Sequence, residues 1–171
     1  MLLTDDNPAP DFSDPLGLLA ACHRRMLDLC ELLDRLPHWI EANGVDREVE
    51  DSVTRIKRYF ETAAPLHHQD EEQDLFPMLI HDVAARALIG QLQQEHRQLD
   101  RLWQDLAAQL QALAQGEYDA PAFDAAAIPF CHAYRTHVQQ EDSQLLKIAQ
   151  AQLSTSQLQQ LGDAMARRRH S

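Results

Sequence analysis

Hydrophobic positions recur at steps of three and four residues along most of the chain. This spacing places side chains on one face of an α-helix, and it is sustained far longer than a strand pattern would be. The links between the periodic segments are short, so consecutive helices should pack as antiparallel neighbours. The sequence therefore predicts an all-α fold, an up-down-up-down antiparallel four-helix bundle followed by a short fifth helix at the C-terminus. The predicted helices cover about residues 15–43, 46–79, 83–115 and 121–152, with the fifth beginning after residue 154.

Prolines and capping residues mark several of the predicted helix boundaries. Pro15 suits the first position of the first helix, because it lacks the N–H that would be unsatisfied there. Ser154 and Gln157 have the spacing of a capping box, which opens the short last helix. Pro37 is expected to kink the first helix or to split off its last turn. Pro65 either bends the second helix or starts a new one.

Composition supports a single folded domain. The chain has 171 residues, 44% of them hydrophobic, and only 5 glycines. It is long enough to bury a sizeable core and is rich in good helix formers. We expect an irregular N-terminal tail over residues 1–13, the bundle over 14–152, and a C-terminal helix packing on the bundle over 153–171.

The balance of charge excludes some functions. The formal net charge is −12, from 27 acidic and 15 basic residues. Phosphate binding needs a basic surface, so nucleic acid is not expected as a partner.

No apolar run has the length of a membrane span, and no signal-peptide core follows Met1, so a membrane is not expected either. We expect a cytoplasmic protein whose cysteines, Cys22, Cys30 and Cys131, are reduced.

Two copies of the spacing His-x-x-x-Glu lie about seventy residues apart, each on the apolar face of a predicted helix. Residues four apart on a helix point the same way, and titratable groups are costly to bury unless something pairs with them. Two further histidines face inward alone, on the first and third helices. At about 1.5 Å per residue, all of these side chains fall in one layer of the bundle, about 12–20 Å from the same end. They predict a cage for two metal ions with the ligands His23, His67, Glu71, His96, His137 and Glu141.

The donor types favour iron. Imidazole and carboxylate together suit non-haem iron, and also manganese or zinc, whereas cysteine-rich zinc spacing is absent. The two carboxylates can bridge the two ions. His23 and His67 would hold one ion, and His96 and His137 the other. Six donors leave coordination positions open, as a reactive site requires.

Several neighbouring residues have similar chemistry but a different place in the pattern. His68 and Glu72 also form a His-x-x-x-Glu pair, yet their register matches the polar side of the second helix. We therefore expect them behind the ligands or in solvent. The same argument excludes His132 and Asp142 as ligands. Other residues near the layer are weaker candidates for a role in the site, namely Glu95, Asp100 and Tyr134.

These residues resemble the hemerythrin-like, or HHE cation-binding, family. The resemblance rests on His23, on the segment from His67 to Pro77 (HHQDEEQDLFP), on Glu95–His96, and on His137 to Glu141. It covers about residues 15–150. The family implies an antiparallel four-helix bundle around a non-haem di-iron centre with bridging carboxylates. By this resemblance, the same six residues would be the metal ligands.

The chain differs from the oxygen-carrying hemerythrins on its third helix. Those proteins have five histidines, two of them four residues apart on that helix. Here the positions around His96 are Leu92 and Asp100, so one histidine is left. The set of four histidines and two glutamates is more similar to bacterial proteins associated with repair of iron–sulfur clusters and with nitric-oxide stress.

The sequence leads to one main hypothesis and two alternatives. The main hypothesis is a protein with two iron ions that handles a small ligand (oxygen, nitric oxide or peroxide) or senses or buffers iron, and that binds more than it catalyses. The first alternative is a di-iron enzyme in nitrosative or oxidative stress or in iron–sulfur cluster repair. The second is a metal-free helical interaction module. No protein partner is indicated.

Overall fold

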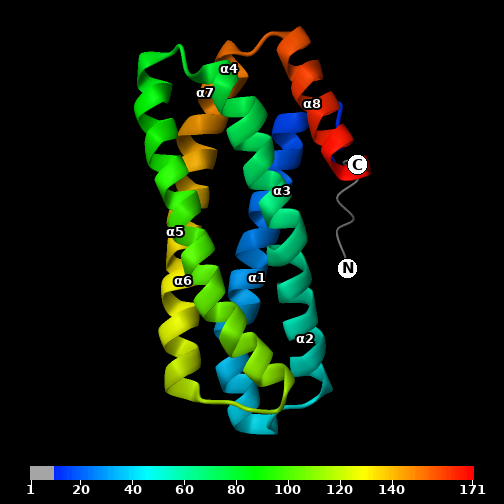
Figure 1. Cartoon of the computed structure of the whole chain (residues 1–171), viewed down its shortest axis with the longest axis vertical. Coiled ribbons are helices and arrows are strands. Elements are labelled where there is room, and N and C mark those ends of the chain that lie inside the picture. Colours follow the sequence, from blue (N-terminus) through cyan, green and yellow to red (C-terminus); the bar gives the residue numbers. More distant parts are fainter. Residues whose placement is uncertain (1–9) are drawn as a thin grey trace, which may run out of the picture.

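The structure is a computed structural model that describes residues 10–171, and the regular structure in this part is entirely helical. Four helical rods form the bundle, and a shorter helix follows (Figure 1). The all-α bundle predicted from the sequence is confirmed. Residues 10–14 precede the first helix, and the remainder of the expected tail lies outside the described residues.

Two of the rods are single α-helices and two are interrupted by π-helical turns, which we label η. The first rod is α1 (Pro15–Asn43) and the third is α5 (Val83–Ala114). The second rod consists of α2 (Arg47–Arg58), η1 (Tyr59–Ala63), α3 (Ala64–Gln69), η2 (Asp70–Leu75) and α4 (Phe76–Leu79). The fourth consists of α6 (Ala120–Gln140), η3 (Glu141–Leu145) and α7 (Leu146–Gln152), and the last helix is α8 (Thr155–His170).

The rods pack in a closed ring. α1 contacts α2 and α6, and α5 contacts the same two helices from the other side. α8 packs against α1 and η2, beside the end of the bundle that carries α4 and α7 (Figure 1). Among the described helices, none has both the length and the hydropathy needed to cross a membrane.

Helix boundaries follow the local sequence closely. The Asp14 side chain accepts a hydrogen bond from the Gly17 amide at 3.0 Å, and the capping box of Ser154 and Gln157 is formed. The expected split at Pro37 does not occur, because α1 runs through it without a break. A proline inside a helix costs about 3 kcal/mol. The buried side chains of neighbouring turns, including Leu33, offset this cost by packing in the core.

The hydrophobic core is divided into two clusters by one polar layer. On each rod, the histidine or the His-x-x-x-Glu pair lies between a residue of one cluster and a residue of the other. On α1, for example, His23 lies between Leu19 and Met26, and on α5 His96 lies between Leu92 and Leu99. The larger cluster fills the end near the α5–α6 connection, and the smaller one fills the end that α8 covers (Figure 1).

The π-helical turns change the phase of the second rod. Steps of three and four residues from Phe60 to His67 would bury Ala63, but the buried residue is Ala64. A π-turn holds more residues than an α-turn, so inward positions there are spaced more widely. η2 contains Glu71 and η3 begins at Glu141, so both buried glutamates lie in π-helical turns.

α8 is attached to the second rod by charge. Asp70 is fully buried, and its two oxygens accept hydrogen bonds from Arg168 at 2.5 Å and from Arg169 at 2.6 Å. Arg168 also donates to Asp74 at 2.5 Å. Both arginines lie in the last turn of α8, where positive charge complements the dipole of that helix. They also neutralise a carboxylate that directly precedes Glu71.

The Asp70 contact gives the first prediction. Replacing Asp70 with alanine should lower the free energy of unfolding by about 3 kcal/mol, the low end of the cost of removing one partner from a buried ion pair. Urea unfolding of the metal-free protein measures the change. Arg167→Gln is the matched control, because this arginine is exposed on the same helix, and it should have little effect. Equal stability of the Asp70→Ala variant and the unmodified protein would contradict an α8 held by this contact.

Candidate metal centre

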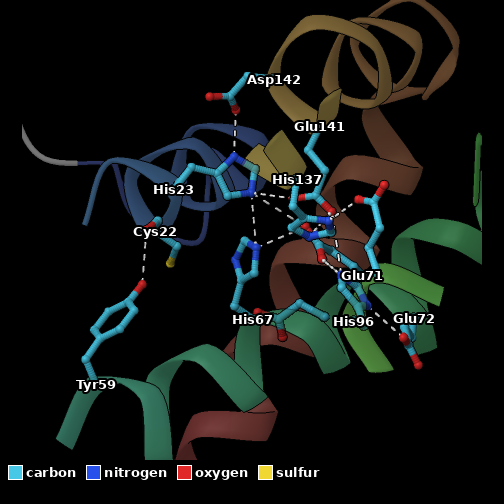
Figure 2. A network of polar contacts seen from close by, with 12 residues as sticks. Cys22, His23, Tyr59, His67, Glu71, Glu72, His96, His137, Glu141 and Asp142 are labelled. Atoms are coloured by element: carbon cyan, nitrogen blue, oxygen red, sulfur yellow. Dashed lines mark hydrogen bonds and ion pairs between the residues drawn. The ribbon is translucent and has the colours of Figure 1, made fainter. Parts of the chain in front are cut away.

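Six ionisable side chains from all four rods meet in the polar layer (Figure 2). Each is at most 3% exposed. These are the six residues that the sequence pattern placed in one layer: His23, His67, Glu71, His96, His137 and Glu141.

Each glutamate is close to its own rod's histidine and to a histidine of another rod. His67 Nε2 lies 3.0 Å from Glu71 Oε1, and His96 Nε2 lies 3.2 Å from Glu71 Oε2. His137 Nε2 lies 3.1 Å from Glu141 Oε1, and His23 Nε2 lies 2.8 Å from Glu141 Oε2. The carboxylates therefore lie between two pairs of histidines (Figure 2).

Most of these close contacts are not well-formed hydrogen bonds. Both oxygens of Glu71 and of Glu141 are buried without a partner in hydrogen-bonding geometry, and so are the Nε2 atoms of His96 and His137. Two nitrogens, His23 Nε2 and His67 Nε2, approach each other at 3.1 Å. Ligands about 2.1 Å from one ion and at right angles stand about 3 Å apart. The donor set therefore fits metal ions better than it fits a hydrogen-bonded network.

The donors divide into two groups that overlap. In each group, one ligand atom from every residue lies within 4.8 Å of the others. The first group contains His23 and His67, and the second contains His96 and His137, while Glu71 and Glu141 belong to both. This arrangement has the donors for two neighbouring ions that share two carboxylates.

Three of the four histidines are held from behind by an acidic side chain. His23 Nδ1 lies 2.6 Å from Asp142, His96 Nδ1 lies 2.7 Å from Glu72, and His137 Nδ1 lies 2.8 Å from Glu95. A carboxylate on one ring nitrogen orients the ring and keeps the other nitrogen available for a metal. The position of Glu72 agrees with the expectation of a residue behind the ligands. The sequence contains a signal for two of these acids, because each buried glutamate is followed directly by a second acid, Glu72 or Asp142.

His67 is the exception among the four histidines. Its Nδ1 is buried and has no hydrogen-bond partner in the part of the chain that the structure describes. The side chain of Cys22 lies next to it (Figure 2) and helps to raise the pKa of His67. The sequence did not indicate this neighbour, because Cys22 and His67 lie on different rods.

Without metal, the layer is stabilised by protonated histidines. Burial alone would lower the pKa of His23, but contacts with Asp142 and with the two buried glutamates raise it to about 12. In the same way, the acidic neighbours outweigh burial and raise the pKa of His67 to about 9 and that of His96 to about 10. The pKa of His137 is also raised, against the effect of burial, by Glu141 and Glu95.

The two central glutamates shift in the opposite direction. Burial would raise the pKa of Glu71, but His67, His23 and His96 hold it well below its usual range. For Glu141, burial and the charge of Glu71 favour the protonated form, yet the surrounding histidines lower the pKa. The metal-free layer is therefore a compact set of imidazolium–carboxylate pairs, and metal ions must displace protons to bind.

His68 differs from our expectation. We placed it on the polar side of the second rod, but its Nε2 is buried and its ring stacks on His96, with centroids 4.0 Å apart and an interplanar angle of 19°. The π-turns on either side of α3 change the phase of the rod, so two consecutive residues can both face the interior. Burial and the adjacent histidines lower the pKa of His68 well below its ordinary value, so the ring is neutral.

The other candidates take different places. Tyr134 is 3% exposed and belongs to the larger core cluster, beside the polar layer. Asp100 is exposed, and it lines a small cavity together with Tyr134 and His68. His132 is exposed on α6, in agreement with its exclusion as a ligand.

Comparison with known proteins agrees with this geometry. The model of the hemerythrin HHE cation-binding domain matches residues 14–149. A protein of Haemophilus influenzae, described as uncharacterized, is 32% identical over 162 residues, which cover 92% of this chain and 91% of that protein.

The pKa shifts predict how the metal-free protein responds to pH. Raised histidine pKa values stabilise the fold below about pH 6.5, the unfolded value, and this stabilisation is lost as the pH rises through the folded values. Lowered glutamate pKa values stabilise it above about pH 4.5 and lose this effect in acid. The melting temperature of chelator-treated protein should therefore be highest at about pH 5–6. It should fall progressively above about pH 6.5, as the pH approaches the folded pKa values of about 9 for His67, about 10 for His96 and about 12 for His23.

A double variant serves as the control for this pH dependence. Glu71→Gln combined with Glu141→Gln removes the carboxylates that raise the histidine pKa values. The alkaline decrease in melting temperature should then be much smaller. A melting temperature of the unmodified metal-free protein that rises from pH 6.5 to 9 would contradict the imidazolium–carboxylate layer.

Proposed function

This chain belongs to the hemerythrin HHE cation-binding family, and from this premise we propose that it is a non-haem di-iron protein that binds a small ligand such as oxygen, nitric oxide or peroxide, or senses or buffers iron. The proposed ligands are the six buried residues of the polar layer, with Glu71 and Glu141 bridging the two ions. When bound, iron would supply the redox and ligand-binding chemistry that these side chains lack.

The observation that carries the proposal is the sharing of both carboxylates by two groups of donors. A single ion would need only one of the two groups. Two ions use both, and the carboxylates then neutralise part of the charge on each ion. The acids behind His23, His96 and His137 would make these rings better ligands, as such partners do in other metal sites.

The choice of iron rests on the donor set. Imidazole with carboxylate suits iron, manganese and zinc, and thiolate, which zinc and copper(I) favour, is absent from the donor set. Six protein donors, two of them shared, leave coordination positions free on two octahedral ions. Free positions are what a protein needs in order to bind a small molecule, whereas a purely structural site is closed.

A small cavity beside the layer supports a ligand of a few atoms. Its volume is about 290 Å³, and His68 and Tyr134 are in its lining. This space lies at the lower end of the usual size range of ligand pockets and is ample for a molecule of a few atoms. We propose that the protein binds the ligand rather than turning it over, and that it acts in the cytoplasm, where its free cysteines would stay reduced.

Metal analysis tests the proposed site. Protein made with ample iron should contain two metal ions per chain, mostly iron, and His137→Ala should lose at least one of them. His132→Ala is the control, since this exposed histidine lies on the same helix, and it should keep both ions. One ion in the unmodified protein would rule out the dinuclear site, and none would favour the metal-free interaction module.

A second experiment separates binding from turnover. Iron-loaded protein titrated with nitric oxide should bind a stoichiometric amount, with a change in the absorption spectrum. It should consume neither nitric oxide nor peroxide over many equivalents. Sustained consumption that His137→Ala abolishes would instead support the alternative of a di-iron enzyme.

A further inference from the structure

His68 is a buried polar group that the six proposed ligands leave unexplained. Its Nε2 has no hydrogen-bond partner in the described part of the chain. An unsatisfied buried polar atom is costly, so an unused one in a native structure requires an explanation. One ring nitrogen of His68 also lies within 4.8 Å of ring nitrogens of His96 and His137. His68 therefore belongs to the surroundings of this half of the layer.

The stacking of His68 on His96 argues against a role as a further metal ligand. An imidazole nitrogen binds a metal in the plane of its own ring, because its lone pair lies in that plane. The rings of His68 and His96 are nearly parallel, at 19°, with centroids 4.0 Å apart. Two rings stacked in this way cannot both direct a lone pair at one ion. His96 already directs Nε2 at the shared carboxylates, so His68 is aimed elsewhere.

His68 lines a cavity whose lining includes none of the six proposed ligands. It is lined by Phe60, Ala64, His68, Leu99, Trp103 and Tyr134, among others. The exposed carboxylates of Glu61 and Asp100 also belong to the lining. A carboxylate accepts hydrogen bonds and does not donate them when ionised, so His68 is one of the groups there that can donate one to a small molecule. On the opposite half of the layer, the side chain of Cys22 contacts His67. The two halves are therefore unequal, and the half with His96 and His137 is the one next to the cavity.

We propose that His68 donates a hydrogen bond to the small molecule bound on the His96–His137 side of the layer, which enters from this cavity. The proposal rests on the proposed di-iron function. A group that hydrogen-bonds a metal-bound atom stands about 4–5 Å from the metal, one coordination bond plus one hydrogen bond away. A ring nitrogen of His68 lies within 4.8 Å of ring nitrogens of His96 and His137, close enough for His68 to reach a small molecule held beside them. The favoured ligand has a few atoms and carries negative charge or a lone pair on its outer atom.

Azide is a suitable probe, because it is small, anionic and has a strong infrared absorption. The test compares the unmodified iron-loaded protein with His68→Phe and His68→Gln. Phenylalanine keeps a ring that can stack on His96 but cannot hydrogen-bond, whereas glutamine restores a donor. His68→Phe should keep both iron ions and bind azide about tenfold more weakly, the order expected for one lost hydrogen bond. His68→Gln should recover part of the affinity.

The azide stretching band gives a readout that a merely structural role would not change. In the unmodified protein the band should shift between H₂O and D₂O, and in His68→Phe this shift should disappear. Glu61→Gln is the control, because Glu61 lines the same cavity but is exposed. It should leave both affinity and isotope shift unchanged.

Each other outcome overturns the proposal in a recognisable way. Loss of an iron ion from His68→Phe would show that His68 is a metal ligand. Unchanged azide affinity with a persistent isotope shift would show that His68 only fills space. Failure of the unmodified protein to hold iron or azide would refute the proposed di-iron function itself, and would be seen before any variant is compared.

Discussion

Burial of six ionisable side chains in one layer is the constraint on which the rest of this structure depends. Such groups are stable inside a protein only if their charges are compensated and their polar atoms are paired. In the metal-free layer, protons on the histidines provide the compensation by neutralising Glu71 and Glu141. In the proposed holoprotein, two metal ions do so. The donors approach one another closely without proper hydrogen-bond geometry. Two bound metal ions explain this arrangement better than protonated histidines do.

The same constraint connects the four rods. Glu72 on the second rod reaches His96 on the third, and Asp142 on the fourth reaches His23 on the first. Each of these acids directly follows a buried glutamate, so one short segment supplies both a central carboxylate and the support for a histidine of another rod. The π-helical turns at these segments widen the helix where two consecutive acids must point in different directions. Asp70, held by two arginines, links α8 to the same segment.

The two halves of the layer are chemically different, although their donors are similar. On one side, His67 lies against Cys22 of α1, and α1 is one of the two elements that α8 contacts. On the other side, His96 is stacked against His68, which lines the cavity. Membership in the HHE family does not separate the two halves, because both contain the same types of donor and lie in the same bundle. In the proposed function, the small ligand would be recognised on the half that faces the cavity, which His68 and Tyr134 line.

The sequence by itself determined the helices, their capping residues and the layer in which the six donors meet. These features depend on local rules, since residues three and four apart share a helix face and short links make neighbouring helices antiparallel. The sequence did not reveal the π-turns, the contact between Asp70 and two arginines almost a hundred positions later, or the stacking of His68 on His96. Only the tertiary structure decided these, because they depend on the rotation of one helix against another. His67 and His68 are adjacent in the chain, and a small rotation of their helix determines which of them faces the carboxylates and which faces the cavity.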